Sequence, residues 1–180
     1  MMMAKFYPQL DAQLCEFIGQ QQLFFTATAP IEGRINLSPK GIDTLRCLDF
    51  DRVAYLDLTG SGNETAAHVS QNGRMTMMFC SFTAQPLILR LYGTGSVIRP
   101  DTTQWDNLIT NFADLPGKRQ IILLQIESVQ TSCGYGVPIY ELQTERTTLS
   151  DWALNKGNDG VRAYQLKKNH TSIDGLAIDI

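Results

Sequence analysis

The sequence predicts a mainly β domain, built as a barrel of antiparallel strands with helices at its periphery. Three observations support this fold class. Apolar, aromatic and β-branched residues gather in five or six short runs, which turn residues separate. Helical spacing is confined to three or four short segments, too few for the crossovers of a doubly wound parallel sheet. Closure into a barrel also removes the edge strands that an open sheet would expose.

The chain is expected to begin with a helix and a hairpin. One helical face is formed by apolar residues at positions i, i+4, i+7 and i+8: Leu10, Leu14, Phe17 and Ile18. Residues 23–29 are rich in aromatic and β-branched side chains and predict a strand. Residues 30–33 contain Pro and Gly, which favour a turn, and residues 34–38 then return as the second arm.

A strand, a turn and a short helix are predicted next. The strand spans residues 52–58, the turn residues 59–63 and the helix residues 64–71. Asn63 is well placed to cap this helix, because its side chain can accept a backbone N–H of the first turn. The unit therefore puts glycines and hydroxyls immediately before a helix N-terminus.

The second half of the chain continues the same alternation. Residues 74–82 are apolar enough for a central strand covered on both faces. Residues 87–98 predict the next strand, in which Gly93 and Gly95 indicate a bend or bulge. The other predicted elements are a helix that Asp101 caps and Pro116 stops, a strand over residues 121–129, a loop over residues 133–138, a helix over residues 151–156 that Ser150 caps and Gly157 ends, and a polar tail from Lys167.

Length and composition fit one domain over residues 1–180, with residues 167–180 as its C-terminal tail. The formal charge of −3 predicts neither nucleic acid nor a membrane surface as a partner. No apolar run reaches the roughly 20 residues that span a bilayer. The N-terminus also lacks the apolar stretch of a secretory signal, so we expect a cytoplasmic protein.

The cysteines and histidines give little sign of chemistry. The four cysteines are scattered without a C-x-x-C pair, so we expect inert thiols and no metal site. Acyl-transfer hydrolysis is not expected, because no serine lies in a nucleophile elbow. His68 fits the surface of the predicted helix, although it could also face a cofactor or ligate haem iron, and His170 lies in the polar tail. No catalytic residue is assigned.

The segment between the predicted strand and helix has the composition of a phosphate cradle. It reads Thr59-Gly60-Ser61-Gly62-Asn63-Glu64-Thr65. Glycines let the backbone approach a ligand, hydroxyls donate, and the helix N-terminus offers free N–H groups. The segment matches neither the phosphate loop of nucleotide hydrolases nor the dinucleotide fingerprint. A solvated strand-to-helix turn is the alternative interpretation.

A second polar cluster ends the predicted hairpin and reads Asn36-Leu37-Ser38-Pro39-Lys40-Gly41. The ammonium of Lys40 could supply the positive charge that backbone amides provide only in part. A surface lysine with a free side chain is the alternative.

Four segments in a fixed order carry a resemblance to a known family. They are residues 36–41, residues 55–61 (YLDLTGS), residues 72–79 (NGRMTMMF) and residues 90–93 (RLYG). Together they resemble the pyridoxamine 5'-phosphate oxidase-related family over residues 5–130, and the tail resembles one branch of it. The resemblance implies an FMN-binding split barrel of antiparallel strands, found as a homodimer with two flavin sites at the subunit interface.

The resemblance also implies a set of cofactor-binding residues. Asn36 and Ser38 would lie along the flavin ring or ribityl chain, and Lys40 would pair with the phosphate. The phosphate cradle would be formed by Thr59, Gly60, Ser61, Gly62, Asn63, Glu64 and Thr65. A loop at the position from which the partner subunit reaches across the flavin would be formed by Ser132, Cys133, Gly134 and Tyr135.

The chain departs from the oxidase proper at several of these positions. Glu64 and Thr65 replace an Arg-Lys pair, Ile88 replaces a glutamine and Ser132 replaces a tryptophan. We therefore do not expect vitamin B6 oxidation. The sequence favours an FMN-dependent oxidoreductase that passes hydride between the flavin and a small substrate or nicotinamide cofactor. The alternative is a non-catalytic flavin- or haem-binding module, and a deazaflavin could replace FMN.

Overall fold

The computed structural model describes residues 4–180, so Met1–Met3 of the predicted domain lie outside the described residues. Its strands are β1 (Lys5–Tyr7), β2 (Phe24–Thr28), β3 (Asn36–Lys40), β4 (Leu45–Cys47), β5 (Arg52–Leu58), β6 (Arg74–Cys80), β7 (Ile88–Ile98) and β8 (Lys118–Ser132). Its helices are α1 (Ala12–Gly19), α2 (Glu64–Asn72), α3 (Thr103–Ile109) and α4 (Thr148–Lys168).

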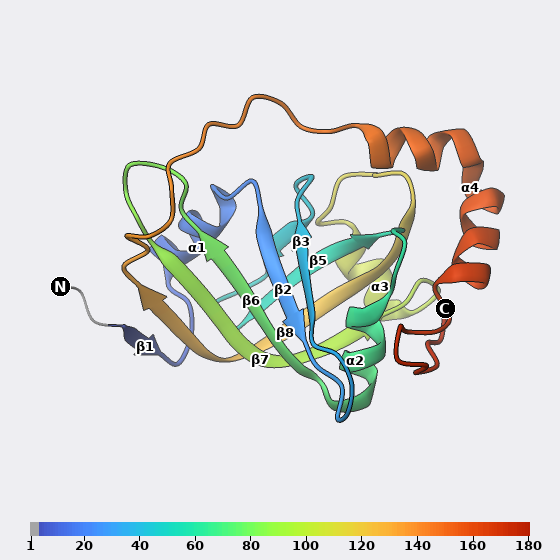
Figure 1. Cartoon of the computed structure of the whole chain (residues 1–180), viewed down its shortest axis with the longest axis horizontal. Helices are drawn as coiled ribbons and strands as arrows, with labels where there is room; N and C mark the ends of the chain where they lie inside the picture. The colour runs from blue at the N-terminus through green and yellow to red at the C-terminus, as the bar shows by residue number, and fades with distance from the viewer. Residues whose placement is uncertain (1–3) are drawn as a thin grey trace.

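The eight strands form one antiparallel sheet that curls on itself (Figure 1). The hydrogen-bonded order is β3-β2-β6-β7-β8-β5-β4, and β1 joins the far end of β8. The helices lie around the sheet, with α2 directly after β5 and α4 at the C-terminal side. This arrangement confirms the predicted mainly β, antiparallel split barrel.

A bulge in β8 opposite Tyr92 and Gly93 lets the two longest strands curl, and Glu127 is its extra residue. The register between β7 and β8 shifts between Tyr92 and Gly93. A Cβ atom at Gly93 would collide with the carbonyl oxygen of Gln125 on β8, so only glycine fits this close approach. The predicted bulge is therefore confirmed, and its cause is the contact between two backbones.

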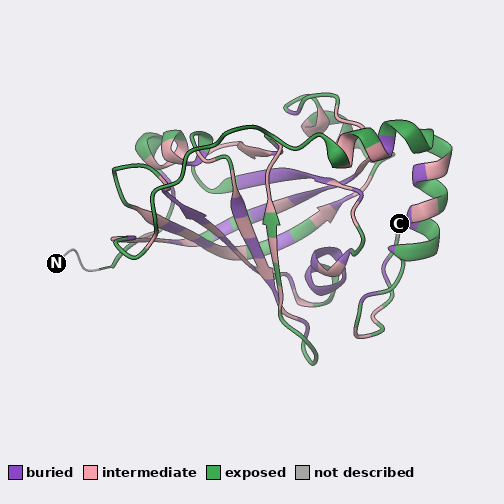
Figure 2. Cartoon of the chain, turned by 45° about the horizontal axis from the view of Figure 1, so that its top comes forward, coloured by how far each residue is buried: buried purple, intermediate pink, exposed green. Residues whose placement is uncertain are grey.

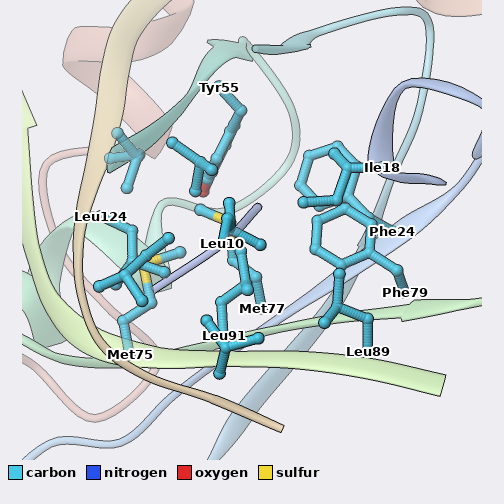
Figure 3. Packing of buried hydrophobic residues seen from close by; sticks show 14 of the residues in the cluster. Leu10, Ile18, Phe24, Tyr55, Met75, Met77, Phe79, Leu89, Leu91 and Leu124 are labelled. Carbon is cyan, nitrogen blue, oxygen red and sulfur yellow. The ribbon is translucent and has the colours of Figure 1, made fainter. Parts of the chain in front are cut away.

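The core lies inside the curl and has two parts. Val53 and Tyr55 of β5 face the main cluster, whereas Ala54 and Leu56 face a second cluster beneath α3. All of β5 between its ends is consequently buried, as Figure 2 shows in purple. In the main cluster the ring of Phe24 meets Tyr55 edge-on, with centroids 5.6 Å apart, and stacks on Phe79 (Figure 3).

Three helices differ from the prediction at their ends. α1 begins at Ala12, so Leu10 of the predicted helical face precedes it, and α3 ends at Ile109, before the predicted stop at Pro116. The predicted helix 151–156 is the first part of α4: Gly157 breaks the helical geometry with φ 67°, but helix resumes and continues to Lys168. α3 is capped by Thr102, whose hydroxyl accepts from the backbone N–H of Trp105 at 3.2 Å, rather than by Asp101. Asp101 has φ 66° and turns the chain before the helix.

The C-terminal tail folds back against α2 (Figure 1). Thr171 and Ala177 form a bridge, and Ile178 packs on Ala66 and Ala67 of α2. The carboxylate of Asp174 accepts from the backbone N–H of Arg34 at 2.7 Å. The tail is thus tied both to α2 and to the connection between β2 and β3. No helix among residues 4–180 is long and apolar enough to cross a membrane.

Candidate functional site

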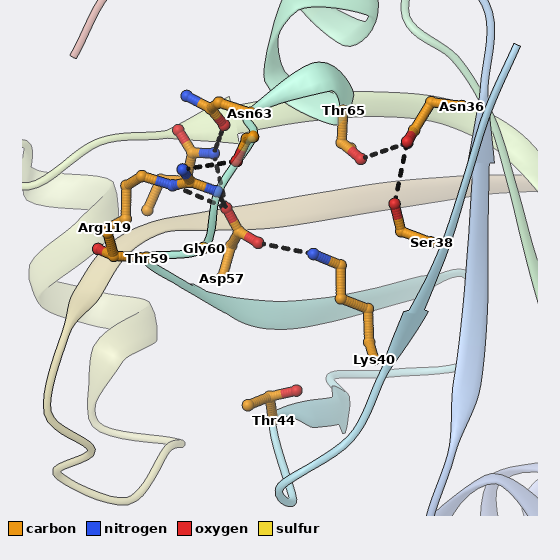
Figure 4. Close-up of polar contacts among 12 residues, drawn as sticks. Asn36, Ser38, Lys40, Thr44, Asp57, Thr59, Gly60, Asn63, Thr65 and Arg119 are labelled. Carbon is orange, nitrogen blue, oxygen red and sulfur yellow. Dashed lines mark hydrogen bonds and ion pairs between the residues drawn. The ribbon is translucent and has the colours of Figure 1, made fainter. Parts of the chain in front are cut away.

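The polar side chains of β3 share one face, because alternate residues of a strand point the same way. Asn36, Ser38 and Lys40 lie on this face and are half-buried. The ammonium of Lys40 reaches Asp57 of β5, with 3.0 Å between Nζ and Oδ1 (Figure 4). Asn36 donates to the hydroxyl of Thr65 at 3.2 Å and accepts from the hydroxyl of Ser38 at 3.0 Å.

Asp57 is the centre of a buried charge cluster. Its carboxylate is only 3% exposed and contacts two cations, Lys40 and Arg119. Nη2 of Arg119 lies 2.7 Å from Oδ2, and the amide of Gln120 donates to the same oxygen at 2.9 Å. Two cations and one carboxylate leave the cluster with an excess of positive charge.

The pKa values in this cluster follow from burial and from these ion pairs. Burial alone would raise the pKa of Asp57, but Lys40 and Arg119 outweigh it and hold that pKa well below its usual range. Burial alone would lower the pKa of Lys40, yet Asp57 and Tyr55 raise it. Burial raises the pKa of Tyr55 to about 12. Lys40 and Asp57 are therefore charged, and Tyr55 neutral, throughout the physiological pH range.

Several polar groups of the predicted phosphate cradle are hydrogen-bonded to other parts of the protein. The hydroxyl of Thr59 donates to the carbonyl oxygen of Gly117 at 2.8 Å and accepts from Gln165 of α4 at 2.8 Å. Gly62 offers its carbonyl oxygen to Arg119 at 2.9 Å. These contacts fix the loop but leave less of it for a ligand than the sequence predicted.

Asn63 does not cap α2 as predicted. Its side-chain oxygen accepts from Gln120 at 2.7 Å, and its side-chain nitrogen donates to the carbonyl oxygen of Asn169 at 3.3 Å. The Asn63 side chain points into the protein, between β8 and the end of α4, and is therefore only 3% exposed. Asn169 in turn donates to the carbonyl oxygen of Gly60 at 3.2 Å.

Glu64 and His68 also lie differently from the prediction. Oε1 of Glu64 accepts from the backbone N–H of Ile173 in the tail at 3.0 Å. His68 is 1% exposed, so its prediction as a helix-surface residue is wrong. Its Nδ1 lies 3.0 Å from the hydroxyl of Thr28, and its Nε2 lies 3.9 Å from Oε2 of Glu64. His68 packs between α2 and β2 because the short helix lies against the sheet.

A cavity of about 740 Å³ opens beside Lys40 and the first part of the cradle loop. Its floor includes Lys40 and residues 59–61, and its roof comes from residues 142–152 and Tyr164. Most of the lining is apolar, and the volume lies within the range of small-molecule sites. A Cβ atom added at Gly60 would meet no atom within 4 Å, so the floor is open at this glycine.

The structure separates the last predicted group from this cavity. Ser132 and Cys133 line a different cavity of about 200 Å³, together with Lys5 and Leu87. In Figure 1 the chain leaves β8 at that end, crosses the top of the sheet and enters α4 on the other side. Within one chain, residues 132–135 therefore lie apart from Lys40, and Tyr135 is exposed.

Several residues of the site were missed by sequence reasoning. Arg119 and Gln120 immediately precede the predicted strand 121–129, and register places Gln120 opposite Asp57. A signal did exist: an acid inside the apolar run 55–58 requires buried partners. Gln165 and Arg146 gave no comparable signal, because residues 142–165 reach the site only through the path of the chain.

The comparisons with known proteins agree with this architecture. The family model for pyridoxamine 5'-phosphate oxidase matches residues 10–133. The chain belongs to the pyridoxamine 5'-phosphate oxidase family. It is 39% identical over 191 residues to the family protein ustO of Aspergillus flavus, covering 95% of this chain and 76% of that protein.

Two solved structures share the fold of this family member. One is a pyridoxamine 5'-phosphate oxidase candidate from Lactobacillus delbrueckii, with a TM-score of 0.56 and 18% identity, covering 68% of this chain and 94% of that one. The other is the FAD binding protein of Mycobacterium smegmatis, with a TM-score of 0.51 and 11% identity, covering 70% of this chain and 97% of that one.

Proposed function

We propose that this chain binds FMN in the cavity beside Lys40, and that it passes hydride between the flavin and a small substrate or a nicotinamide cofactor. The observation that carries the proposal is a mostly apolar cavity of about 740 Å³ with a cation and an open glycine loop in its floor. Membership of the family supports it. So does the shared fold with an FAD binding protein.

The residues of the cavity fit a flat ring joined to a phosphate. Lys40 keeps a quarter of its side chain exposed and uses one ammonium N–H for Asp57, so it still has donors for an anion. Ser61 adds a hydroxyl and Gly60 leaves room for a close approach. Leu23, Pro39 and Ile42, on the floor side of the cavity, offer apolar surface for an isoalloxazine ring.

The chain's own residues would hold and orient the cofactor. Lys40 would contact the phosphate, with Ser61 beside it, while Asp57 and Arg119 fix the position of that lysine. Asn36 and Ser38 lie on the same face of β3 as Lys40 and form a hydrogen-bonded row with Thr65. None of the three lines the cavity, so a ribityl chain would have to extend beyond Lys40 to meet them. When bound, the flavin supplies the hydride chemistry, which requires no acid or base from the protein.

A homodimer would complete this site. Residues 132–135 lie away from the cavity of their own chain, so only a second copy could bring them to it. Strand β3 carries Lys40 on one face and lies at the edge of the sheet. Its outer side exposes Leu37 at 64%, next to Ile35 at 77%. Exposed apolar residues on an edge strand favour pairing with another copy. Sedimentation of the purified protein would test this state.

The departures from the oxidase argue against vitamin B6 as the substrate. Glu64 replaces a cation at the first turn of α2, and its carboxylate is bonded to the tail rather than to a cation. The alternative of a haem-binding module has less support, because the buried His68 does not line the cavity. A flavin-binding module without turnover stays the main alternative. Anaerobic addition of NADH or NADPH to the FMN complex separates it from an enzyme.

The absorption spectrum of the purified protein, recorded after adding FMN and removing the excess, tests the cofactor. We expect a bound-flavin spectrum in the wild type. Gly60→Val should abolish it, because a Cβ atom at Gly60 meets no protein atom within 4 Å and the valine side chain would extend into the floor of the cavity. Gly19→Val is the matched control, since a Cβ atom at Gly19 also meets no atom within 4 Å but Gly19 lies on α1, outside the cavity.

Two outcomes would contradict the proposal. A wild-type protein that stays colourless with FMN would exclude the flavin, and the same titration with a deazaflavin or haem would follow. FMN binding that survives in folded Gly60→Val would place the flavin outside this cavity.

Lys40→Ala should weaken FMN binding by about tenfold, in line with the loss of one charge-assisted hydrogen bond.

A further inference from the structure

We propose that the substrate of this cavity is a small organic anion with a flat apolar body, and that Arg146 binds its anionic group. The inference rests on the proposed function, because it names the substrate class of the same cavity. It concerns the roof, whereas the flavin proposal concerns the floor.

The roof is built by a part of the chain beyond the family match. The family model ends at residue 133, and the roof residues follow it. They are Leu142, Thr144, Glu145, Arg146, Thr148, Leu149, Trp152 and Tyr164. The strap over residues 133–147 carries the chain across the top of the sheet to α4 (Figure 1). The floor therefore lies within the residues that the family model matches, whereas the roof lies outside them and is where a substrate can be selected.

The roof offers a flat apolar surface. Trp152 and Tyr164 both line the cavity and contact each other edge-to-face, with ring centroids 5.0 Å apart. This contact holds the indole in place, and Leu142 and Leu149 extend the apolar surface on either side. An aromatic or flat unsaturated group would bury its faces here, whereas a strongly hydrated ligand would lose water without compensation.

The charge of the lining favours an anion. Among residues 4–180, the guanidinium of Arg146 has no ion pair and no hydrogen bond, and Arg146 is the arginine that lines this cavity. The other cation of the lining, Lys40, lies in the floor, where we propose that it contacts the flavin phosphate. Glu145 is the single acid of the lining, so cations outnumber acids there, whereas the whole chain carries −3. A planar guanidinium can grip a carboxylate or phosphate with two parallel hydrogen bonds.

Arg146 and Glu145 are neighbours of opposite charge, so substitutions at the two positions should change the binding of an anion in opposite directions. The probe is benzoate, measured by equilibrium dialysis with flavin-free and FMN-loaded protein, and neutral benzamide is the comparison ligand. Arg146→Ala should weaken benzoate binding by about tenfold, and Arg146→Lys by less, because the ammonium keeps the charge but loses the planar fork. Glu145→Gln should strengthen benzoate binding by about twofold, because a repelling charge is removed. The affinity for benzamide should be the same in all three variants as in the wild type.

Arg74→Ala is the matched control. Its side chain is the other arginine without an ionic or hydrogen-bond partner among residues 4–180, and it lies at the start of β6, outside the cavity. It should leave benzoate binding unchanged. Equal losses in Arg74→Ala and Arg146→Ala would reduce the effect to the net charge of the protein and overturn the proposal. Equal affinity for benzoate and benzamide would overturn it as well.

Measuring benzoate binding and FMN binding separately distinguishes this inference from the flavin proposal. Arg146-dependent benzoate binding in a protein that never binds FMN would support the anion site and reject the flavin. FMN binding without Arg146-dependent benzoate binding would do the reverse. Loss of benzoate binding when FMN is loaded would show that Arg146 serves the flavin itself, which also overturns a substrate role. All variants should keep the melting temperature of the wild type, because Arg146 and Glu145 are exposed.

Discussion

Lys40 and Asp57 join the two ends of the curled sheet, with 3.0 Å between Nζ and Oδ1. Lys40 lies on β3, the first strand in the hydrogen-bonded order, and Asp57 lies on β5, next to the last. No backbone ladder connects these two strands. The ion pair therefore spans the gap of the split barrel, and its lysine lies in the floor of the cavity in which we propose the flavin binds.

Replacing the carboxylate of this pair should destabilise the fold. Asp57→Asn leaves the buried guanidinium of Arg119 and the half-buried Lys40 without a counter-charge. We expect the free energy of unfolding to fall by about 3 kcal/mol, measured with urea. Asp114→Asn is the control, because Asp114 forms an exposed pair with Lys118 and its loss should change stability little. Equal effects of the two substitutions would contradict a central role for Asp57.

The same carboxylate should make stability depend on pH in the acid range. Burial opposes its charge, but Lys40 and Arg119 lower the pKa of Asp57 in the folded state below its unfolded value. Its contribution is therefore complete above about pH 4, the unfolded value, and is lost as the pH falls through the folded value. Between these limits the wild type should lose up to about 1.4 kcal/mol more per pH unit than Asp57→Asn. Parallel pH profiles of the two proteins would contradict this prediction.

Gly93, opposite the bulge in β8, should tolerate no side chain. Gly93→Ala would push a methyl group into the carbonyl of Gln125 and separate β7 from β8. We expect a loss of about 2 kcal/mol in unfolding free energy. Gly19→Ala provides the comparison, because nothing lies within 4 Å of the added carbon and alanine favours the helix. A Gly93→Ala protein as stable as Gly19→Ala would show that the bulge can relax.

The end of α4 should control the mobility of the cradle loop. Asn169→Ala removes the hydrogen bond to the carbonyl oxygen of Gly60 and should cost about 1 kcal/mol. Hydrogen exchange of the backbone amides of residues 60–65 should then become faster. Asn158→Ala, on the exposed side of α4, should leave these amides unchanged. Exchange confined to α4 in Asn169→Ala would mean that another contact holds the loop.

Much of the fold could be predicted because its signals are local. The strand over residues 52–58 and the start of the following helix were predicted at the observed residues, since apolar periodicity and turn residues mark both. The strands β1 and β4 were missed, because three residues are too few to show a period. The second half of α4 was also missed, since Gly157 is a valid stop signal and the helix resumes after it.

The site was predictable only where neighbours in sequence are neighbours in space. Lys40 and residues 59–61 do line one cavity, as the two polar clusters suggested. The side chains of Thr59 and Asn63 form hydrogen bonds with residues of α4 and β8, which lie more than 50 residues away in the sequence. No pattern in one segment announces such contacts, so the sequence could suggest a free cap and a free hydroxyl where the folded chain has neither.

The place of β8 in the sheet has a consequence for how the protein is made. β8 lies between β7 and β5, so the two halves of the sheet are joined only through it. Yet β8 is the last of the described strands to be synthesised, and the 59 residues 59–117 separate it from β5. Among the described strands, β5 has only the short β4 as a hydrogen-bonded neighbour during translation, until residue 132 has left the ribosome tunnel. Sheet assembly is thus a late event, and the nascent chain is exposed to chaperones or aggregation throughout that interval.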